Sequence, residues 1–282
     1  MPEYPEVTVV RKSLSNLVEG VKITNVVLLN TKFIKNATYQ EFQEFVKNKT
    51  IEKIENVGKF IIFYLSENHR MLCHLRMSGK FYVYKAGDET QANLPHNYVF
   101  FTLDNGYIMA YNDARMFGGF EIIDPSDTRS VSEIKNLAEL PAFVNVDKLY
   151  AKLQRKNISI KSALLDQSLV LGIGNIYVDE TLHACKVYPM TKCSKISKEK
   201  LAEILTTAQQ IMDKSIELGG SSVNTYTSVN GIDGKFQNKL KVYGRGGLIC
   251  QTCYKVNVAK VKLDFKENGR GTSYCPNCQK EA

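Results

Sequence analysis

The chain has 282 residues, of which 44% are hydrophobic, so it is long enough for about two folded domains and has no long polar tract typical of disorder. Lys and Arg number 37 against 29 Asp and Glu, and the formal net charge of +8 favours an anionic partner such as nucleic acid. No apolar run is long enough to cross a bilayer, and the first residues lack the pattern of a signal peptide. We therefore expect a cytosolic protein that does not associate with membranes, in which structural disulfides are rare.

A helical pattern followed by strand patterns occupies the first half of the chain. Residues 2–18 repeat apolar side chains at helical spacing and place Pro5 and Glu6 in the first turn, which predicts a helix. Residues 22–124 are predicted to be mostly strands, and Asp104-Asn105-Gly106 is a typical hairpin turn between two of them. Several short strands with turns between them favour a β-sandwich or barrel. The strand patterns are Phe60–Leu65, Met71–Tyr84, Tyr98–Leu103 and Tyr107–Tyr111.

The second half of the chain begins with a polar stretch from Pro125 to about Pro141, which we interpret as a connection between domains. Helical patterns follow it. Residues 219–237 are rich in Gly, Ser, Asn and Thr, which predicts a long loop of the kind that often carries function. The predicted helices are Val146–Arg155, Ile160–Gln167, Ile176–Cys185 and Ser197–Leu218.

Four of the seven cysteines form two C-x2-C pairs near the C-terminus, Cys250 with Cys253 and Cys275 with Cys278. Four thiolates complete a tetrahedral shell at about 2.3 Å from a zinc ion and leave no position for a water molecule. We therefore predict one structural Zn²⁺. A disulfide or iron–sulfur arrangement is the alternative for the same spacing. The remaining cysteines are predicted to be reduced core residues: Cys73, Cys185 and Cys193.

Arg270 lies between two glycines in the loop that joins the cysteine pairs. Flanking glycines let the backbone bend and turn the guanidinium outward, where it can bind a phosphate through two hydrogen bonds. An ordinary solvated arginine explains the same pattern equally well.

Pro2 and Glu3 place a potential nucleophile beside a carboxylic acid. Removal of Met1, which is normal before a small residue, leaves the secondary amine of Pro2 at the terminus. An α-amino group has a pKa of about 8, so about 10% of it is free base at pH 7, and the start of a helix favours the neutral amine further. Such an amine adds to an aldehydic carbon to form an iminium, and Glu3 can serve as general acid. Taken alone, the same residues are explained by a plain helix start.

A set of segments in order along the chain carries a resemblance to a known family. The sequence resembles the bacterial formamidopyrimidine-DNA glycosylase family, which is related to endonuclease VIII, over essentially its whole length. Each segment is a weak signal alone, whereas all of them in family order before a terminal cysteine motif are specific. The segments are Pro2–Val7, Gly58–Phe60, His74–Gly79, Asn112–Gly118, Gly172–Tyr177, Gly219–Ser222 and Lys241–Arg245.

The resemblance implies a role for each catalytic residue. Pro2 is implied as the nucleophile at C1′ of the damaged nucleotide, and Glu3 as the acid that assists opening of the sugar ring. Lys59 is implied to bind a phosphate and assist β-elimination. Arg270 is implied to bind the same phosphates and assist δ-elimination.

The resemblance also implies DNA contacts. Met77, Arg115 and Phe117 match positions that fill the space left by an extruded nucleotide and so recover part of the lost stacking. His96, Lys156 and Asn175 match other DNA-contact positions, and Asn175 is predicted to be the N-cap of a helix whose amides favour phosphate. Taken alone, Met77 and Phe117 are typical of a core, and His96 and Lys156 of a solvated surface.

Three positions depart from the family pattern. Ala114 stands where the family usually has Pro, Met116 where a basic residue is common, and Asn224 where the loop often has Arg. In the family, these positions take part in recognition of the opposite base and in the lesion pocket. The departures therefore weaken the prediction of the substrate more than the prediction of the reaction.

We predict an α+β multidomain fold. Residues 2–130 form an N-terminal catalytic β-sandwich with flanking helices, and residues 131–145 form a linker. A helical helix–two-turn–helix domain with the lesion loop follows over residues 146–238, and a zinc ribbon over residues 239–282. The predicted activity is that of a bifunctional DNA glycosylase and abasic-site lyase of base excision repair, acting on oxidised purines. The predicted partner is double-stranded DNA with oxidised bases or abasic sites, bound by a monomer in a basic cleft between the domains, in the bacterial cytosol and nucleoid. Walker-type and dinucleotide fingerprints are absent, so no redox cofactor or nucleotide is implied.

Three other functions are alternatives. An endonuclease VIII-like glycosylase would act on oxidised pyrimidines. A lesion-binding protein without catalysis would have lost Pro2, Glu3 or Lys59, and all three are present. A zinc-ribbon transcription or RNA-binding module would not need the N-terminal motif and would bind undamaged nucleic acid tightly.

Overall fold

The structure is a computed structural model that describes residues 2–222 and 227–281, so Asn224 lies outside the described residues. Its contacts group into two compact units: Met1–Ser130 with Leu218–Lys235, and Val131–Glu217 with Phe236–Ala282. Residues 218–235 thus group with the first unit, whereas the predicted ranges assign them to the helical domain. The described hydrogen bonds explain this grouping, since Asn230 Oδ1 accepts from the backbone N–H of Val83 at 2.8 Å.

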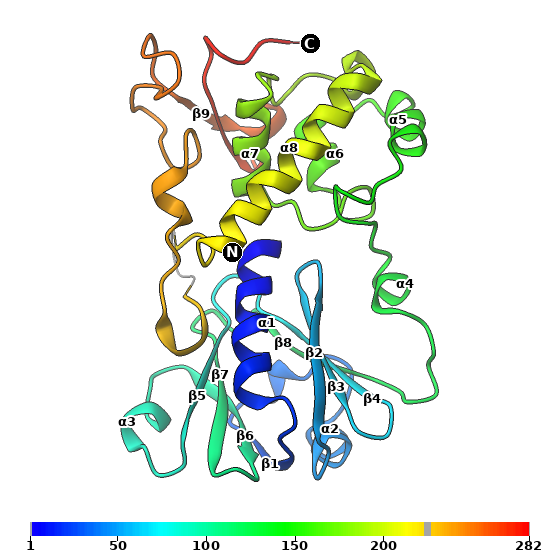
Figure 1. Cartoon of the computed structure of the whole chain (residues 1–282), viewed down its shortest axis with the longest axis vertical. Helices are drawn as coiled ribbons and strands as arrows, with labels where there is room; N and C mark the ends of the chain where they lie inside the picture. Colours follow the sequence, from blue (N-terminus) through cyan, green and yellow to red (C-terminus); the bar gives the residue numbers. More distant parts are fainter. Residues whose placement is uncertain (1, 223–226, 282) are drawn as a thin grey trace. The chain divides into compact units, whose positions relative to one another are not determined.

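The first unit contains two four-stranded antiparallel sheets, which confirms the predicted β-sandwich (Figure 1). One sheet has the strand order β1-β6-β7-β5 and the other β2-β3-β4-β8. The predicted hairpin at Asp104-Asn105-Gly106 joins β6 to β7, and Gly106 supplies the positive φ of +82° that the turn requires. The strands are β1 (Ile23–Leu28), β2 (Ile51–Val57), β3 (Phe60–Leu65), β4 (His69–His74), β5 (Lys80–Lys85), β6 (Asn97–Leu103), β7 (Tyr107–Asn112) and β8 (Gly119–Ile123).

Among its described residues, the first unit has the α-helices α1, α2 and α3. The helix α1 (Tyr4–Val18) begins with Pro5 near its N-terminus and buries Val7, Val10 and Leu14 along one face, as the helical spacing predicts. The helix α2 (Tyr39–Val46) lies within the region predicted to be mostly strands. Thr38 caps it by accepting from the backbone N–H of Glu41 at 3.2 Å, and its apolar face buries Phe42 and Val46. A single turn, α3 (Glu89–Ala92), precedes β6.

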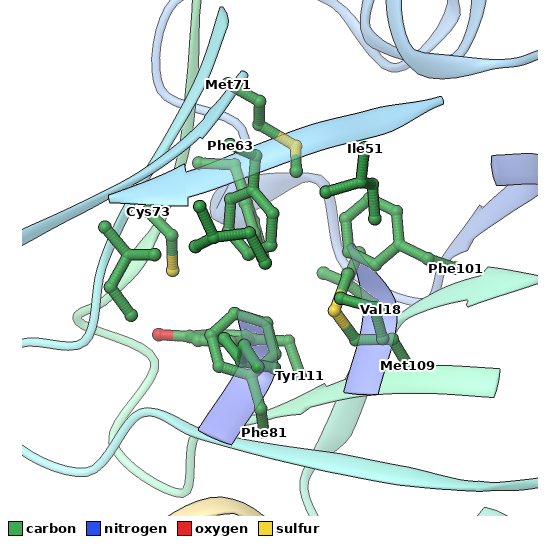
Figure 2. Close-up of a cluster of buried hydrophobic side chains, with 14 of the residues drawn as sticks. Val18, Ile51, Phe63, Met71, Cys73, Phe81, Phe101, Met109 and Tyr111 are labelled. Atoms are coloured by element: carbon green, nitrogen blue, oxygen red, sulfur yellow. The ribbon is translucent and has the colours of Figure 1, made fainter. Parts of the chain in front are cut away.

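The core of the first unit draws side chains from α1 and from both sheets (Figure 2). Aromatic rings pack edge to face in it, with Tyr111 and Phe120 centroids 5.1 Å apart. Cys73 is fully buried in this cluster, and burial raises the pKa of its thiol well above the usual value. Each such large side chain stabilises the fold by about 1.5–3 kcal/mol on burial, so this core gives the neighbouring turns a firm support.

The second unit contains the predicted helices and one more. These are α5 (Val146–Gln154), α6 (Ile160–Leu165), α7 (Asn175–Ala184) and α8 (Lys198–Glu217), while α4 (Val131–Lys135) lies within the predicted linker. Side chains cap two of them, because Asn145 accepts from Lys148 N at 3.0 Å and Ser159 accepts from Ser162 N at 3.3 Å. Within the described ranges, no helix is long and apolar enough to cross a membrane.

A small hairpin ends the second unit. Its strands β9 (Ala259–Lys262) and β10 (Gly271–Tyr274) pair antiparallel, and residues 263–270 form the turn between them. The remaining short segments are 3₁₀ turns: η1 (Thr31–Phe33), η2 (Cys193–Lys195), η3 (Val229–Gly231), η4 (Phe236–Lys239) and η5 (Leu263–Phe265).

Candidate active site and nucleic-acid interface

The start of α1 buries the proposed nucleophile and acid. Pro2 and Glu3 are both buried, and Glu3 is only 2% exposed. Glu6 holds this segment, because its Oε2 accepts from the backbone N–H of Glu3 at 2.9 Å while its Oε1 accepts from the backbone N–H of Ser221 at 2.9 Å. Glu6 itself is 1% exposed. One buried carboxyl group therefore joins the chain start to the first residues of the 219–237 loop.

Lys59 lies in the two-residue turn between β2 and β3, directly after Gly58, whose φ is +56°. Asn56 ties this turn to α1. Its Nδ2 donates to the hydroxyl of Thr8 at 3.0 Å and to the carbonyl of Gly58 at 3.4 Å. The hydroxyl of Thr8 in turn donates to the carbonyl of Tyr4 at 2.8 Å. The lysine turn is thus connected by hydrogen bonds to the first turn of the helix that follows Pro2.

Two turns of the first unit, residues 75–79 and 113–118, are joined through the buried carboxylate of Asp113. Its oxygens accept from the hydroxyl of Ser78 and from the backbone N–H groups of Arg115 at 3.1 Å, Phe117 at 3.1 Å and Gly118 at 2.8 Å. The hydroxyl of Ser78 also accepts from the N–H of Arg115 at 3.2 Å. These hydrogen bonds connect the turn that contains Met77 to the turn that contains Arg115 and Phe117.

The side chains presented by the 113–118 turn are exposed. Phe117 is 54% exposed, and the guanidinium of Arg115 lies 5.1 Å from the centre of its ring. Met116 is 37% exposed and has a positive φ of +53°, and Ala114 is also exposed. An exposed aromatic ring on a turn that is fastened to a buried carboxylate is unlike a core residue, so the core interpretation of Phe117 is excluded.

His96 lies next to the same turn. Its carbonyl accepts from the backbone N–H of Asp113 at 3.0 Å, and its exposed ring approaches the hydroxyl of Tyr98 at 3.5 Å. Its φ is +72°, a conformation uncommon outside glycine and asparagine. The backbone hydrogen bond therefore places His96 beside the proposed DNA-contact residues of the first unit.

In the second unit, Asn175 is the first residue of α7 rather than its N-cap, which is Gly174. The prediction of an Asn175 N-cap is thus wrong by one position. The reason is that its side chain is engaged elsewhere, since Nδ2 donates to the carbonyl of Gly271 at 3.0 Å. Lys156 is exposed in the turn after α5, with its N–H bonded to the carbonyl of Leu153 at 3.0 Å.

Arg270 is exposed at the end of the 263–270 turn, immediately before β10. Its carbonyl accepts from the backbone N–H of Leu263 at 2.8 Å, which closes the turn. Gly269 is needed there, because an added Cβ would lie 2.4 Å from the carbonyl oxygen of Leu263. Within this unit, Asn175 is hydrogen-bonded to the residue that follows Arg270. Lys156 lies on a separate turn.

The four clustered cysteines can hold a metal ion, since their Sγ atoms all lie within 4.8 Å of one another. Cys250 Sγ lies 3.9 Å from Cys278 Sγ, and Cys253 Sγ lies 3.7 Å from Cys275 Sγ. Four thiolates at about 2.3 Å from one zinc ion would stand about 3.8 Å apart, so the donor set fits. A hydrogen bond from the Lys255 backbone lowers the pKa of Cys253 to about 6, whereas burial raises the pKa values of Cys275 and Cys278, so the donor set is identified by its geometry.

The other cysteines are buried and outside this cluster, as predicted. Burial raises the pKa of Cys185 and raises that of Cys193 to about 11, so both remain thiols.

Sequence reasoning missed two residues that organise these sites. Glu6 was assigned only to the first turn of a helix, although the Glu3-x-x-Glu6 spacing is that of a capping box. Asp113 lies within the family-like segment Asn112–Gly118, and its burial depends on the fold rather than on that segment. No sequence signal indicates Ser78 as the partner of Asp113, because the two residues lie in separate connections between the sheets, β4–β5 and β7–β8.

Comparisons with known proteins agree over the whole chain. A family model described as the formamidopyrimidine-DNA glycosylase N-terminal domain matches residues 1–120, and one described as the formamidopyrimidine-DNA glycosylase H2TH domain matches residues 139–227. The formamidopyrimidine-DNA glycosylase of Mycoplasmopsis pulmonis is 42% identical, covering 100% of this chain and 99% of that protein. The one of Ureaplasma parvum is 40% identical, covering 99% of this chain and 100% of that protein.

Solved structures of Lactococcus lactis Fpg have the same fold. A complex of the wild-type protein with DNA containing N7-benzyl-Fapy-dG has a TM-score of 0.90 at 30% identity, covering 99% of this chain and 100% of that one. A complex with DNA containing an abasic site has a TM-score of 0.88 at 30% identity and the same coverage. The fold is therefore that of a DNA glycosylase. The chain belongs to the formamidopyrimidine-DNA glycosylase family, and the resemblance drawn from the sequence is confirmed.

Proposed function

We propose that this protein is a bifunctional glycosylase and abasic-site lyase of base excision repair, which removes oxidised purines from DNA and cuts the strand by β- and δ-elimination. The observation that carries the proposal is the buried Pro2–Glu3 segment, fastened by Glu6 at the start of α1 in a member of this enzyme family. Burial places an amine and an acid side by side where water competes poorly for a reacting sugar.

Covalent catalysis begins once Met1 is removed, because an acylated Pro2 nitrogen is an amide and not a nucleophile. The nitrogen lone pair attacks C1′, and the damaged base leaves with the glycosylic electron pair and takes up a proton. The nitrogen then loses its own proton. Glu3 donates a proton to the ring oxygen as the C1′–O4′ bond breaks, which leaves an iminium between Pro2 and C1′.

The iminium makes strand cleavage possible. It withdraws electrons from the sugar, so a base can remove a proton from C2′ and the 3′ phosphate leaves, which is β-elimination. Loss of a proton from C4′ with departure of the 5′ phosphate completes δ-elimination. Lys59 binds a phosphate and assists the first step, and Arg270 binds phosphate through its planar guanidinium and assists the second.

The remaining site residues hold the DNA. Met77, Arg115 and Phe117 fill the space left by the extruded nucleotide, which offsets a few kcal/mol of lost stacking. His96, Lys156 and Asn175 contact the DNA around the lesion. What supports the first three of these residues is that Asp113 accepts hydrogen bonds from the backbones of Arg115 and Phe117 and from Ser78, which follows Met77, together with the exposure of the Phe117 ring.

We also propose that the metal is one Zn²⁺, held by Cys250, Cys253, Cys275 and Cys278. When bound, it crosslinks the two cysteine pairs and takes no part in the chemistry, because four thiolates leave no open position. We further propose that the protein acts as a monomer in the bacterial cytoplasm, close to the nucleoid.

The lesion class needs a direct test, because Ala114 and Met116 depart from the family pattern beside the proposed wedge. Excision rates would be compared for duplexes that contain 8-oxoguanine opposite C and thymine glycol. We expect 8-oxoguanine to be the better substrate. Dominant excision of thymine glycol would instead support the endonuclease VIII-like alternative, which acts on oxidised pyrimidines.

A further inference from the structure

A fully buried ion pair lies in the second unit and has no role in the steps above. The ammonium of Lys161, on α6, lies 2.6 Å from Oδ1 of Asp179, on α7, and both side chains are 0% exposed. Burial raises the pKa of Asp179 to about 7, and the neighbouring Lys161 opposes that rise. Buried ion pairs are weak contributors to stability, because apolar side chains of similar volume often stabilise a fold as well or better. The contacts of this ion pair indicate a role other than stability.

The pair contacts three consecutive residues of β10. Lys161 Nζ donates to the carbonyl of Gly271 at 3.1 Å and to the hydroxyl of Thr272 at 2.9 Å. Asp179 Oδ2 accepts from the backbone N–H of Ser273 at 2.8 Å. Together with Asp179, these acceptors use all three protons of the ammonium. The ion pair therefore fixes the strand that begins directly after Arg270.

Further hydrogen bonds hold the turn of Arg270 at both ends. The hydroxyl of Thr272 donates to the carbonyl of Arg270 at 3.3 Å, so Lys161 reaches that residue through Thr272. At the other end of the turn, the hydroxyl of Ser162 on α6 donates to Oδ2 of Asp264 at 3.1 Å. The side chain of Arg270 remains exposed. Neighbouring residues of one helix thus hold the beginning and the end of the 263–270 turn.

We propose that Lys161, paired with Asp179, is a positioning residue that sets the direction in which Arg270 presents its guanidinium to a DNA phosphate. The proposal rests on the function proposed above, in which Arg270 assists δ-elimination. A two-point contact between guanidinium and phosphate depends on orientation, and a displacement of about 1 Å at a reacting group can cost about a hundredfold in rate. Loss of the ion pair should therefore affect δ-elimination more than formation of the iminium.

The test replaces the pair by apolar side chains of similar volume, Lys161→Met together with Asp179→Leu, which removes its hydrogen bonds without leaving a buried unpaired charge. Full-length protein would react in single turnover with a duplex that contains one abasic site. Denaturing gels would separate the β- from the β,δ-products, and borohydride would trap the iminium. We expect trapping within about twofold of the wild type and a fall of about tenfold in the conversion of β- to δ-product.

A matched pair of variants covers the case in which the double replacement does not fold. Thr272→Val removes the hydroxyl that joins Lys161 to Arg270, whereas Thr272→Ser keeps it. We expect a reduced δ-product with Thr272→Val and the wild-type product ratio with Thr272→Ser. Equal product ratios for these two variants, or a wild-type ratio for a folded double replacement, would overturn the inference.

The Arg270→Ala variant separates this inference from the proposed function. If Arg270→Ala lowers the conversion of β- to δ-product, adding the double replacement to it should lower that conversion no further, because both act through one side chain. A further loss would show that Lys161 acts elsewhere. If Arg270→Ala keeps the wild-type ratio, the role assigned to Arg270 is wrong, and the positioning role of Lys161 falls with it.

Discussion

Glu6 holds the start of α1 to the 219–237 loop through hydrogen bonds to the backbones of Glu3 and Ser221. Glu6→Gln keeps its size but turns an amide N–H toward one of these backbone N–H groups. We expect a loss of about 1–3 kcal/mol in the free energy of unfolding, since a buried donor is left without an acceptor. We also expect slower iminium formation, because Pro2 and Glu3 lose their support.

Thermal unfolding and the rate of borohydride trapping would measure these two effects. Glu89→Gln is the matched control, since Glu89 is exposed in the first turn of α3. Equal stability and equal trapping rates in the two variants would show that Glu6 has no such role.

At the residue scale, the sequence predicts a site correctly where the interacting side chains lie in one local motif. The four cysteines lie together because each C-x2-C pair brings two sulfurs to one point, and one hairpin joins the pairs. The role of Asp113 could not be predicted in this way, because its partner Ser78 lies in a different connection between the sheets and becomes a neighbour only when the sheets have formed. The engagement of Asn175 with Gly271 depends on the same kind of long-range packing.

At the scale of elements, the 75–79 and 113–118 turns form one assembly, because Ser78 is hydrogen-bonded to both Asp113 and Arg115. Ser78→Ala removes these bonds and lets the two turns move independently. We expect excision of 8-oxoguanine from intact duplex to fall about tenfold, since the wedge must replace stacked bases. Cleavage at a preformed abasic site should fall by about twofold at most, because less stacking is lost there.

The comparison of the two substrates is the measurement, and Ser126→Ala is the control because Ser126 lies in an exposed turn. If Ser78→Ala slowed both substrates equally, the turns would serve the fold as a whole rather than the insertion of side chains into DNA.

The cysteine cluster makes a prediction for the hairpin β9–β10. Removal of the metal by a chelator should unfold this hairpin, because metal binding and folding are coupled in a site of this kind. The sandwich of the first unit has its own apolar core and should remain folded. Circular dichroism, limited proteolysis and the metal content per chain would report on each part.

Two cysteine variants test the same element. Cys278→Ser should lose the metal and the strand-cleaving activity, whereas Cys193→Ser, which changes a buried cysteine outside the cluster, should keep the metal. Retention of the metal in Cys278→Ser would show that a different set of ligands binds it.

The elements themselves were largely predictable from the sequence. The helices of the second unit and the β6–β7 hairpin follow directly from apolar spacing and turn residues. The helix α2 was missed because it is short and lies among strands, although Thr38 and Glu41 have the spacing of a capping box. The pairing order of the eight sandwich strands has no local signal, because it is decided by contacts between residues far apart in the chain.

At the scale of the whole molecule, the net charge of +8 and the proposed phosphate contacts predict salt-dependent DNA binding. With Lys59, Lys156 and Arg270 on phosphates, affinity should fall about fortyfold between roughly 50 and 200 mM salt. Fluorescence anisotropy with a duplex containing an abasic-site analogue would measure it. Lys156→Ala should reduce the slope of log affinity against log salt by about one. Affinity that does not change with salt would contradict phosphate binding by these side chains.

The most direct measurement for the whole account is borohydride trapping followed by peptide mapping of the adduct. Protein with Met1 removed would react with a duplex containing one 8-oxoguanine, beside a matched protein that retains Met1. We expect a covalent DNA adduct on the nitrogen of Pro2, and none with the Met1-retaining protein, whose Pro2 nitrogen is an amide. An adduct on another residue, or no adduct from processed protein that still binds the lesion, would contradict covalent catalysis by Pro2.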